Sequence, residues 1–314
     1  MNIVFLDAST LGNDVSLDPI AALGNLTCYS NTDNGQQVER IGNAPVVITN
    51  KVKINAEIMD ACPHLQLICV AGTGTDNIDK EYAAKKNIIV KNVAGYSTQS
   101  VAQTTFALLL EIYNHTSYFN QYVHNGDYSR NGLYTCTSHP FVELYGKRMG
   151  IIGMGNIGKQ VAQIALAFGM EVCYYSTSGH NNSATQSFKR VELAEMLSTC
   201  DVISIHAPKN EQTTNLIAAK ELSMMKPTAV LLNTGRGGIV NETDLAYALD
   251  HETIAAAGID VFAKEPFAFD HPFLNMKHPE KLILTPHIAW SSREARIRLI
   301  QSIATNIQTS TIHE

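Results

Sequence analysis

The sequence predicts an α/β protein made of two doubly wound domains, each built on a parallel sheet. Short apolar runs alternate with helix-compatible segments along most of the chain, which is the pattern of a buried parallel sheet. A glycine-rich turn directly after an apolar run stands halfway along the 314 residues, so residues 1–98 form a different unit. The chain contains no internal repeat and no linker rich in Pro and Ser.

The first half of the chain contains three apolar runs that predict short buried strands, at residues 3–6, 45–48 and 67–70. Residues 99–112 then predict an apolar helix. Residues 114–145 are polar and contain several turn signals. Their aromatic side chains exceed what a monomer usually leaves in water: Tyr118, Phe119, Tyr122, Tyr128, Tyr134 and Phe141.

The glycine-rich turn is Gly153-Met154-Gly155-Asn156-Ile157-Gly158, preceded by a predicted strand at residues 149–152. A strand, a tight glycine turn and a helix together place backbone N–H groups and the positive helix end where a pyrophosphate can bind. Glycine-rich turns also occur for packing alone. Here apolar residues at helical spacing follow, Gly169 stands at the expected left-handed cap, and residues 170–175 read as a second strand. We therefore predict a dinucleotide site formed by Gly153, Gly155, Asn156, Ile157 and Gly158.

Composition is that of an ordinary enzyme from a reducing compartment. The formal charge of −6 and the pI near 6.0 argue against nucleic acid or an anionic membrane as partner. No apolar stretch approaches the length of a membrane span. The six cysteines show no CxxC pairing, so we expect reduced thiols, a cytoplasmic location and no metal site.

Four further strands are predicted beyond the glycine turn, at residues 202–205, 229–232, 258–261 and 282–284. Arg236, Glu265 and His287 follow the last three of them. Open α/β sheets place their chemistry at the carboxyl ends of strands. Taken singly, the three residues also fit a loop ion pair, a solvated turn residue and a packed histidine. Together, behind a dinucleotide turn, they predict one catalytic crevice.

Four motifs in order give the chain a resemblance over nearly its whole length to the D-isomer-specific 2-hydroxyacid dehydrogenases. The C-terminal motif is similar to that of the glycerate dehydrogenase (hydroxypyruvate reductase) branch. The motifs are Gly153-Met154-Gly155-Asn156-Ile157-Gly158, Asn233-Thr234-Gly235-Arg236-Gly237, Gly258-Ile259-Asp260-Val261-Phe262 leading to Glu265-Pro266, and Thr285-Pro286-His287-Ile288-Ala289-Trp290.

The resemblance implies a Rossmann cofactor domain at residues 99–287, inserted in a flavodoxin-like substrate domain of residues 1–98 and 288–314. It implies an enzyme that reduces 2-keto acids such as hydroxypyruvate or glyoxylate to D-2-hydroxy acids, with NAD as its cofactor and NADP as the alternative. The alternatives are a dehydrogenase of another small acid (D-lactate, phosphite or formate) and a non-catalytic NAD-sensing corepressor. Residues 114–145 resemble the family's dimerisation arm, so we expect a homodimer.

The resemblance also implies roles for the site residues. His287 would give a proton to the substrate carbonyl, and a carboxylate neighbour such as Glu265 would favour the imidazolium and orient the ring. The planar fork of Arg236 would hold the substrate carboxylate and carbonyl. In the first domain, backbone N–H groups of Thr73 and Gly74 would bind the carboxylate, although that loop also reads as a plain strand-helix turn. Trp290 would line the substrate site.

Further cofactor contacts are expected from residues at strand ends: Ser176, His206, Ala207, Pro208, Thr213, Thr234, Gly235 and Asp260. Asp260 would meet the nicotinamide amide or would only cap its local turn. The acid that usually accepts from the ribose 2′-hydroxyl is replaced by Ser176, and residues 172–191 contain no Asp or Glu. We expect no arginine beside Ser176, because Lys189 and Arg190 lie well downstream. The cofactor preference is therefore open, the resemblance favours NAD, and the expected discrimination against NADPH is modest.

Overall fold

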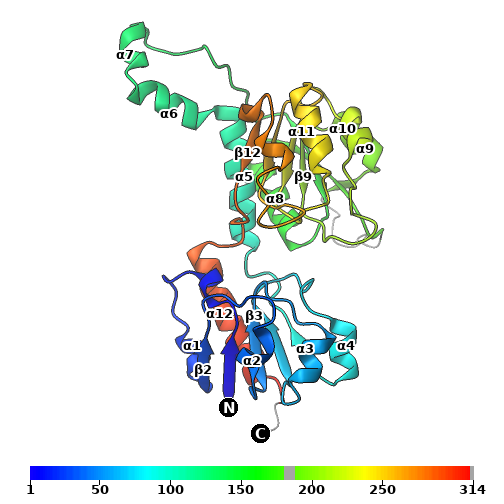
Figure 1. The fold of residues 1–314 in the computed structure, drawn as a ribbon. Coiled ribbons are helices and arrows are strands. Elements are labelled where there is room, and N and C mark those ends of the chain that lie inside the picture. Colours follow the sequence, from blue (N-terminus) through cyan, green and yellow to red (C-terminus); the bar gives the residue numbers. More distant parts are fainter. Residues whose placement is uncertain (180–187, 312–314) are drawn as a thin grey trace. The chain divides into compact units, whose positions relative to one another are not determined.

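The computed structural model describes residues 1–179 and 188–311 (Figure 1). The chain divides into two compact units, one of Met1–Ser97 with Ser291–Glu314 and the other of Thr98–Trp290. Each unit carries its own parallel sheet.

The units divide close to the ends of the expected domains, and local contacts explain the differences. Thr98 is the first residue of helix α5 (Thr98–Asn114) and therefore belongs to the second unit. The backbone N–H groups of Ile288 and Ala289 donate to the carboxylate of Asp260, at 2.8 and 3.0 Å. These bonds tie both residues to the second unit.

The first unit is a five-stranded sheet in the order β2-β1-β3-β4-β5, with all strands parallel. This is the flavodoxin-like order. The predicted strands are present as β1, β3 and β4, whereas β2 and β5 lie at the sheet edges and were not predicted. The strands are β1 (Asn2–Phe5), β2 (Asn25–Cys28), β3 (Val46–Thr49), β4 (Leu67–Val70) and β5 (Ile89–Lys91). The helices are η1 (Ala8–Leu11), α1 (Asp18–Ala21), α2 (Gln37–Ile41), α3 (Ala56–Ala61), α4 (Lys80–Lys85) and α12 (Arg293–Gln308).

The second unit is a seven-stranded parallel sheet in the order β12-β11-β10-β9-β6-β7-β8. The order reverses between β6 and β9, as in a Rossmann fold, and such a switch point is where these sheets bind ligands. The strands are β6 (Arg148–Ile152), β7 (Glu171–Tyr175), β8 (Lys189–Arg190), β9 (Val202–Ile205), β10 (Val230–Asn233), β11 (Ala256–Ile259) and β12 (Leu282–Leu284). The helices after α5 are α6 (Thr116–His124), α7 (Asp127–Asn131), α8 (Asn156–Ala167), α9 (Leu193–Thr199), α10 (Ala219–Met224), α11 (Glu242–Asp250), η2 (Pro272–Leu274) and η3 (Pro279–Lys281).

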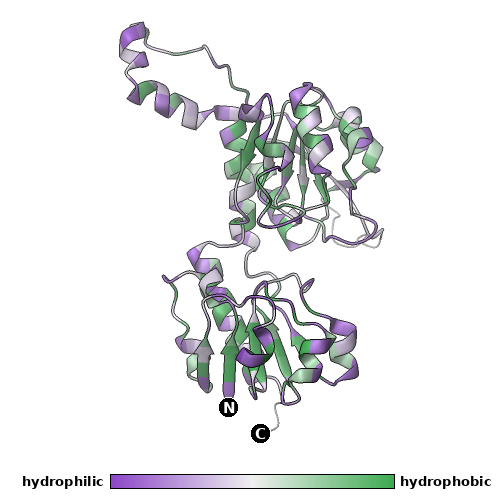
Figure 2. Cartoon of the chain, in the orientation of Figure 1, coloured by the Kyte–Doolittle hydropathy of each residue, from purple (hydrophilic) through white to green (hydrophobic). Residues whose placement is uncertain are grey.

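The central strands of both sheets are apolar, and the covering helices have one apolar and one polar face (Figure 2). Two apolar cores in the second unit pack around its sheet. The strand predicted at residues 258–261 lies two residues earlier, at Ala256–Ile259. Its first residues are alanines followed by Gly258, where a Cβ would lie 2.9 Å from Leu232 and 3.0 Å from Leu108. These small residues give a weak strand signal, yet they let α5 pack closely on the sheet.

The two predicted parallel-sheet domains are therefore confirmed. Gly169 has a φ of +75°, so the predicted left-handed cap after α8 is also confirmed. The aromatic stretch contains two helices that were not predicted, α6 and α7, which extend away from the sheet of the second unit (Figure 1).

Candidate active site

The glycine turn between β6 and α8 has the three properties that a pyrophosphate site needs. Gly153 has a φ of +94°, and a Cβ there would lie 2.8 Å from the backbone nitrogen of Ala207. A Cβ on Gly158 would overlap the carbonyl oxygen of Gly153, so the helix packs directly on the turn. At Gly155, the N-cap residue of α8, a Cβ would meet nothing within 4 Å, and a glycine has no side chain that could cap the helix. Open space therefore adjoins the N-terminus of α8, where the first backbone N–H groups have no intrahelical partner, and this fits a dinucleotide phosphate.

The segment after β9 packs against this turn. The Nε2 atom of His206 lies 2.8 Å from the hydroxyl of Ser204, and burial lowers the pKa of His206 to about 3, so the ring is neutral at physiological pH. The hydroxyl of Thr213 donates to the carbonyl of Pro208 at 2.8 Å and accepts from the backbone N–H of Asn210 at the same distance. Thr213 is fully buried, so it shapes this loop.

The turn after β10 carries Thr234, Gly235 and Arg236. The Asn233 side chain closes it, since its amide donates to the carbonyl of Arg236 at 3.0 Å and its carbonyl accepts from the N–H of Gly235 at 3.1 Å. The hydroxyl of Thr234 lies 3.0 Å from that of Thr105 on α5. Arg236 Nη1 donates to the carbonyl of Gly235 at 2.9 Å. The guanidinium is therefore held near the end of β10.

Glu265 and His287 form the pair that the sequence predicts. Glu265 Oε2 lies 2.6 Å from His287 Nδ1, and Glu265 Oε1 accepts from the backbone N–H of Phe262 at 2.9 Å. The two side chains are 29% and 22% exposed, so water reaches the pair without surrounding it. His287 adopts a φ of +55°, which a non-glycine residue adopts only where its surroundings hold it.

Asp260 accounts for much of the restraint on the His287 backbone. It is fully buried, its carboxylate accepts from the Thr285 hydroxyl at 2.6 Å and from the N–H groups of Ile288 and Ala289, and its backbone carbonyl accepts from the N–H of His287 at 2.8 Å. Burial raises the pKa of Asp260, although these hydrogen bonds and the neighbouring His287 ring oppose the shift. The capping interpretation accounts for all of these bonds, whereas the contact with a nicotinamide amide stays a prediction.

Strand order brings Arg236, Glu265 and His287 together at the carboxyl end of the sheet. They follow β10, β11 and β12, which are neighbours and parallel. Trp290 ends the same unit and is half-buried. The arrangement can polarise an anionic carbonyl compound and give it a proton.

Thr73 and Gly74 lie in the first unit, in the loop after β4. The Thr73 hydroxyl donates to the carbonyl of Val93 at 2.9 Å, and the Asn92 amide donates to the carbonyl of Thr73 at 2.6 Å. These bonds order the loop at the carboxyl end of that sheet. That the backbone N–H groups of Thr73 and Gly74 bind the substrate carboxylate stays a prediction.

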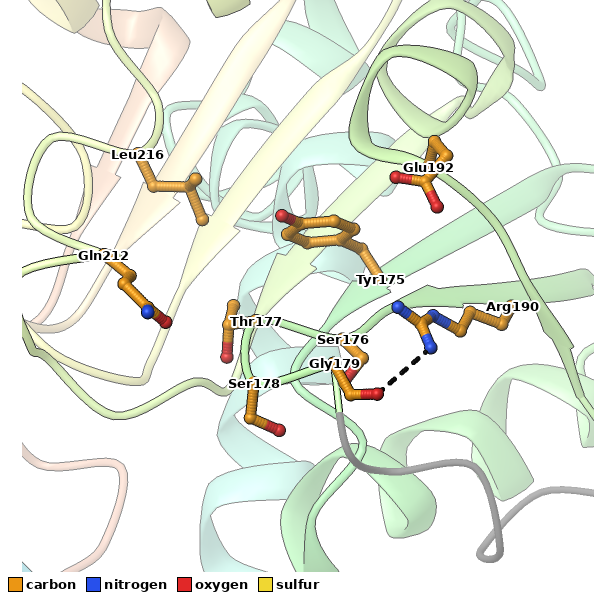
Figure 3. Close-up of a pocket in the computed structure, with 9 residues that line it drawn as sticks. All are labelled: Tyr175, Ser176, Thr177, Ser178, Gly179, Arg190, Glu192, Gln212 and Leu216. Atoms are coloured by element: carbon orange, nitrogen blue, oxygen red, sulfur yellow. Dashed lines mark hydrogen bonds between the residues drawn. The ribbon is translucent and has the colours of Figure 1, made fainter.

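Ser176 lines a pocket of about 440 Å³ after β7, shown in Figure 3. Arg190 lines the same pocket, because β8 pairs with β7 and aligns Arg190 with Tyr174. The expectation that no arginine lies beside Ser176 is therefore wrong. Residues 176 and 190 are far apart in the sequence, but the pairing of β7 with β8 brings them to the same pocket.

Sequence reasoning also missed a second carboxylate-histidine pair. Glu242 Oε2 lies 2.9 Å from His271 Nε2, and Glu242 Oε1 accepts from the N–H of Ala263 at 2.6 Å. The His271 ring stacks on Phe267, with centroids 4.4 Å apart. Glu242 thus binds both Ala263 and His271, which lie on either side of Glu265 in the sequence, and restrains this segment at both ends. Its only signal in the sequence is the aromatic and histidine content of residues 262–273.

Comparison with known proteins decides the family. The sequence profile described as D-isomer specific 2-hydroxyacid dehydrogenase, NAD binding domain, matches residues 106–289. The chain belongs to this family. It is thus an NAD(P)-dependent oxidoreductase of 2-hydroxy acids.

Relatives cover almost the whole chain of this dehydrogenase. It is 38% identical to a hydroxypyruvate reductase of Blautia hydrogenotrophica over 98% of this chain and 96% of that protein. A D-lactate dehydrogenase of Aquifex aeolicus, solved with NAD and lactic acid, has 27% identity and a TM-score of 0.83, covering 98% and 94%. An NADPH-dependent glyoxylate/hydroxypyruvate reductase of Sinorhizobium meliloti, solved with NADP and malonate, has 25% identity and a TM-score of 0.80, covering 98% and 92%. Within the described residues, no helix is both long and apolar enough to cross a bilayer.

Proposed function

We propose that this dehydrogenase reduces 2-keto acids of the hydroxypyruvate and glyoxylate type to D-2-hydroxy acids. The observation that carries the proposal is the 2.6 Å contact between Glu265 and His287, at the sheet edge where Arg236 follows a neighbouring strand. The substrate class is supported by the names of the relatives, which include hydroxypyruvate reductase and glycerate dehydrogenase.

In the proposed reaction, the glycine turn and the N-terminus of α8 hold the pyrophosphate of the dinucleotide. When bound, the reduced nicotinamide supplies a hydride to the keto carbon. His287 Nδ1–H donates to Glu265, which fixes the tautomer and leaves Nε2 to give its proton to the carbonyl oxygen. The Glu265 carboxylate stabilises the protonated ring before the transfer.

Arg236 holds the substrate in this proposal. A guanidinium presents parallel N–H donors that match a carboxylate and the adjacent carbonyl, and it stabilises negative charge that develops on the carbonyl oxygen. We assign the N–H groups of Thr73 and Gly74 to the substrate carboxylate and Trp290 to the wall of the substrate site. Both assignments follow from the sequence motifs that contain these residues.

Initial rates test the proposal directly. The purified protein is assayed with hydroxypyruvate, glyoxylate and pyruvate, each with NADH and with NADPH, by the loss of absorbance of the reduced cofactor. We expect turnover with hydroxypyruvate or glyoxylate and a D-configured product by chiral chromatography. Cofactor binding without turnover of any of the three acids would instead support a non-catalytic nucleotide sensor.

We also propose a cytoplasmic homodimer. All six cysteines are free thiols, which suits a reducing compartment. The segment after α7 exposes apolar side chains, with Tyr134 99% and Phe141 58% exposed. Analytical ultracentrifugation should give twice the chain mass, and Tyr134→Ser together with Phe141→Ser should weaken the association. A monomeric wild type at micromolar concentration would contradict the dimer.

A further inference from the structure

We propose that this dehydrogenase prefers NADP(H) to NAD(H), because the pocket after β7 receives the 2′-phosphate of the adenosine ribose between Ser176 and Arg190. The inference rests on the proposed function, in which the glycine turn holds the pyrophosphate. β7 lies beside β6, the strand that leads into that turn. In Rossmann sheets the end of this second strand faces the adenosine ribose.

The first observation is the hydroxyl of Ser176. The residue is only 4% exposed, and its Oγ is buried without a hydrogen-bond partner among the described residues. A buried hydroxyl that makes no hydrogen bond costs free energy, and a ligand acceptor atom beside it would recover that cost. A phosphate supplies acceptor oxygens, and a neighbouring phosphate oxygen is the partner that this hydroxyl lacks.

The second observation is the positive charge that strand pairing brings to the same pocket. Arg190 lies opposite Tyr174, and its Nη1 donates to the carbonyl of Gly179 at 3.3 Å (Figure 3). This bond directs the guanidinium toward the turn of residues 176–179. A guanidinium matches phosphate geometry with paired N–H donors, and this turn adds the hydroxyls of Thr177 and Ser178 to the pocket wall.

One negative charge lines the pocket, that of Glu192. Figure 3 shows the Arg190 guanidinium between Glu192 and the turn that carries Ser176. The arginine is hydrogen-bonded to that turn, and its charge offsets the repulsion from Glu192. An NAD-specific site needs the opposite arrangement, with an acid at the position of Ser176.

The neighbouring residue of β8 provides a matched control. Lys189 carries the same charge as Arg190, but it pairs with Glu195 at 3.1 Å and does not line the pocket. Lys189→Gln and Arg190→Gln therefore remove one positive charge each from the same two-residue strand. Only the second removes it from the pocket.

Isothermal titration calorimetry tests the inference without catalysis. The probes are adenosine 2′,5′-bisphosphate and 5′-AMP, at constant ionic strength, with the full-length protein. In the wild type we expect the bisphosphate to bind at least about tenfold more tightly than 5′-AMP. Arg190→Gln should remove most of this difference, and Lys189→Gln should leave it within about twofold, because a distant exposed charge is screened.

Ser176→Asp should reverse the preference between the two probes. It places an acid at the family position, so 5′-AMP should then bind more tightly than the bisphosphate. Thermal unfolding of each variant checks that it is folded. Equal affinities for the two probes in the wild type, or equal losses in the Arg190 and Lys189 variants, would overturn the inference. A preference for the bisphosphate in a protein that turns over no keto acid would uphold it and refute the proposed function alone.

Discussion

Replacing Glu265 by Gln separates the charge of this residue from its hydrogen bond. The amide has the size of the carboxylate, and its oxygen still accepts from His287 Nδ1–H, whereas the negative charge 2.6 Å from the ring is lost. A hydrogen bond between charged groups contributes about 1.5–3 kcal/mol, and the 22% and 29% exposure of the two side chains favours the lower value. About 1.4 kcal/mol equals about a tenfold change in rate.

In the proposed reaction His287 gives its proton to the carbonyl oxygen, and the Glu265 carboxylate stabilises that proton donor. Loss of the Glu265 charge removes this stabilisation, so we expect kcat for keto-acid reduction to fall by about tenfold. Stopped-flow and steady-state rates at one fixed pH measure this fall.

A carboxylate-histidine pair elsewhere on the second unit controls for nonspecific effects. Glu280 Oε1 lies 3.1 Å from His278 Nδ1, and both side chains are exposed. Glu280→Gln should leave kcat unchanged. If Glu265→Gln also leaves kcat unchanged, Glu265 is only a turn residue and its charge does not support the proposed proton donor.

Burial on both faces decides which strands the sequence could predict. β3, β4, β9 and β10 are fully buried and appear as continuous apolar runs. β2, β5 and β8 lie at or near sheet edges and are largely exposed, so they contain no such run. Their pairing is imposed by neighbouring strands, and local sequence does not encode it.

The same distinction applies to the site. Arg236, Glu265 and His287 were predictable because each follows a strand closely, and parallel strands end at a common edge. Arg190 was not predictable in this way, because it reaches Ser176 through the pairing of β7 with β8. Side-chain roles that depend on tertiary hydrogen bonds were also hidden, as with Asp260, whose carboxylate holds the backbone that carries His287.

Three further predictions follow from these contacts. His287→Ala should lower kcat for keto-acid reduction by at least about a hundredfold while cofactor fluorescence still reports binding, and a near-normal kcat would exclude it as the proton donor. Arg236→Lys should raise KM for hydroxypyruvate strongly, because a single ammonium group replaces the two parallel N–H donors of the guanidinium. An unchanged KM would exclude Arg236 from carboxylate binding. The last prediction concerns stability. The folded protein keeps His206 neutral down to a pKa of about 3, whereas the unfolded chain binds a proton below about pH 6.5. The unfolded state therefore binds more protons as the pH falls, and between pH 8 and pH 5 this residue alone should lower the free energy of unfolding by about 2 kcal/mol. Urea titrations of the wild type and His206→Gln measure that difference, and identical pH dependence in the two proteins would show that the ring is protonated in the folded state or is not desolvated there.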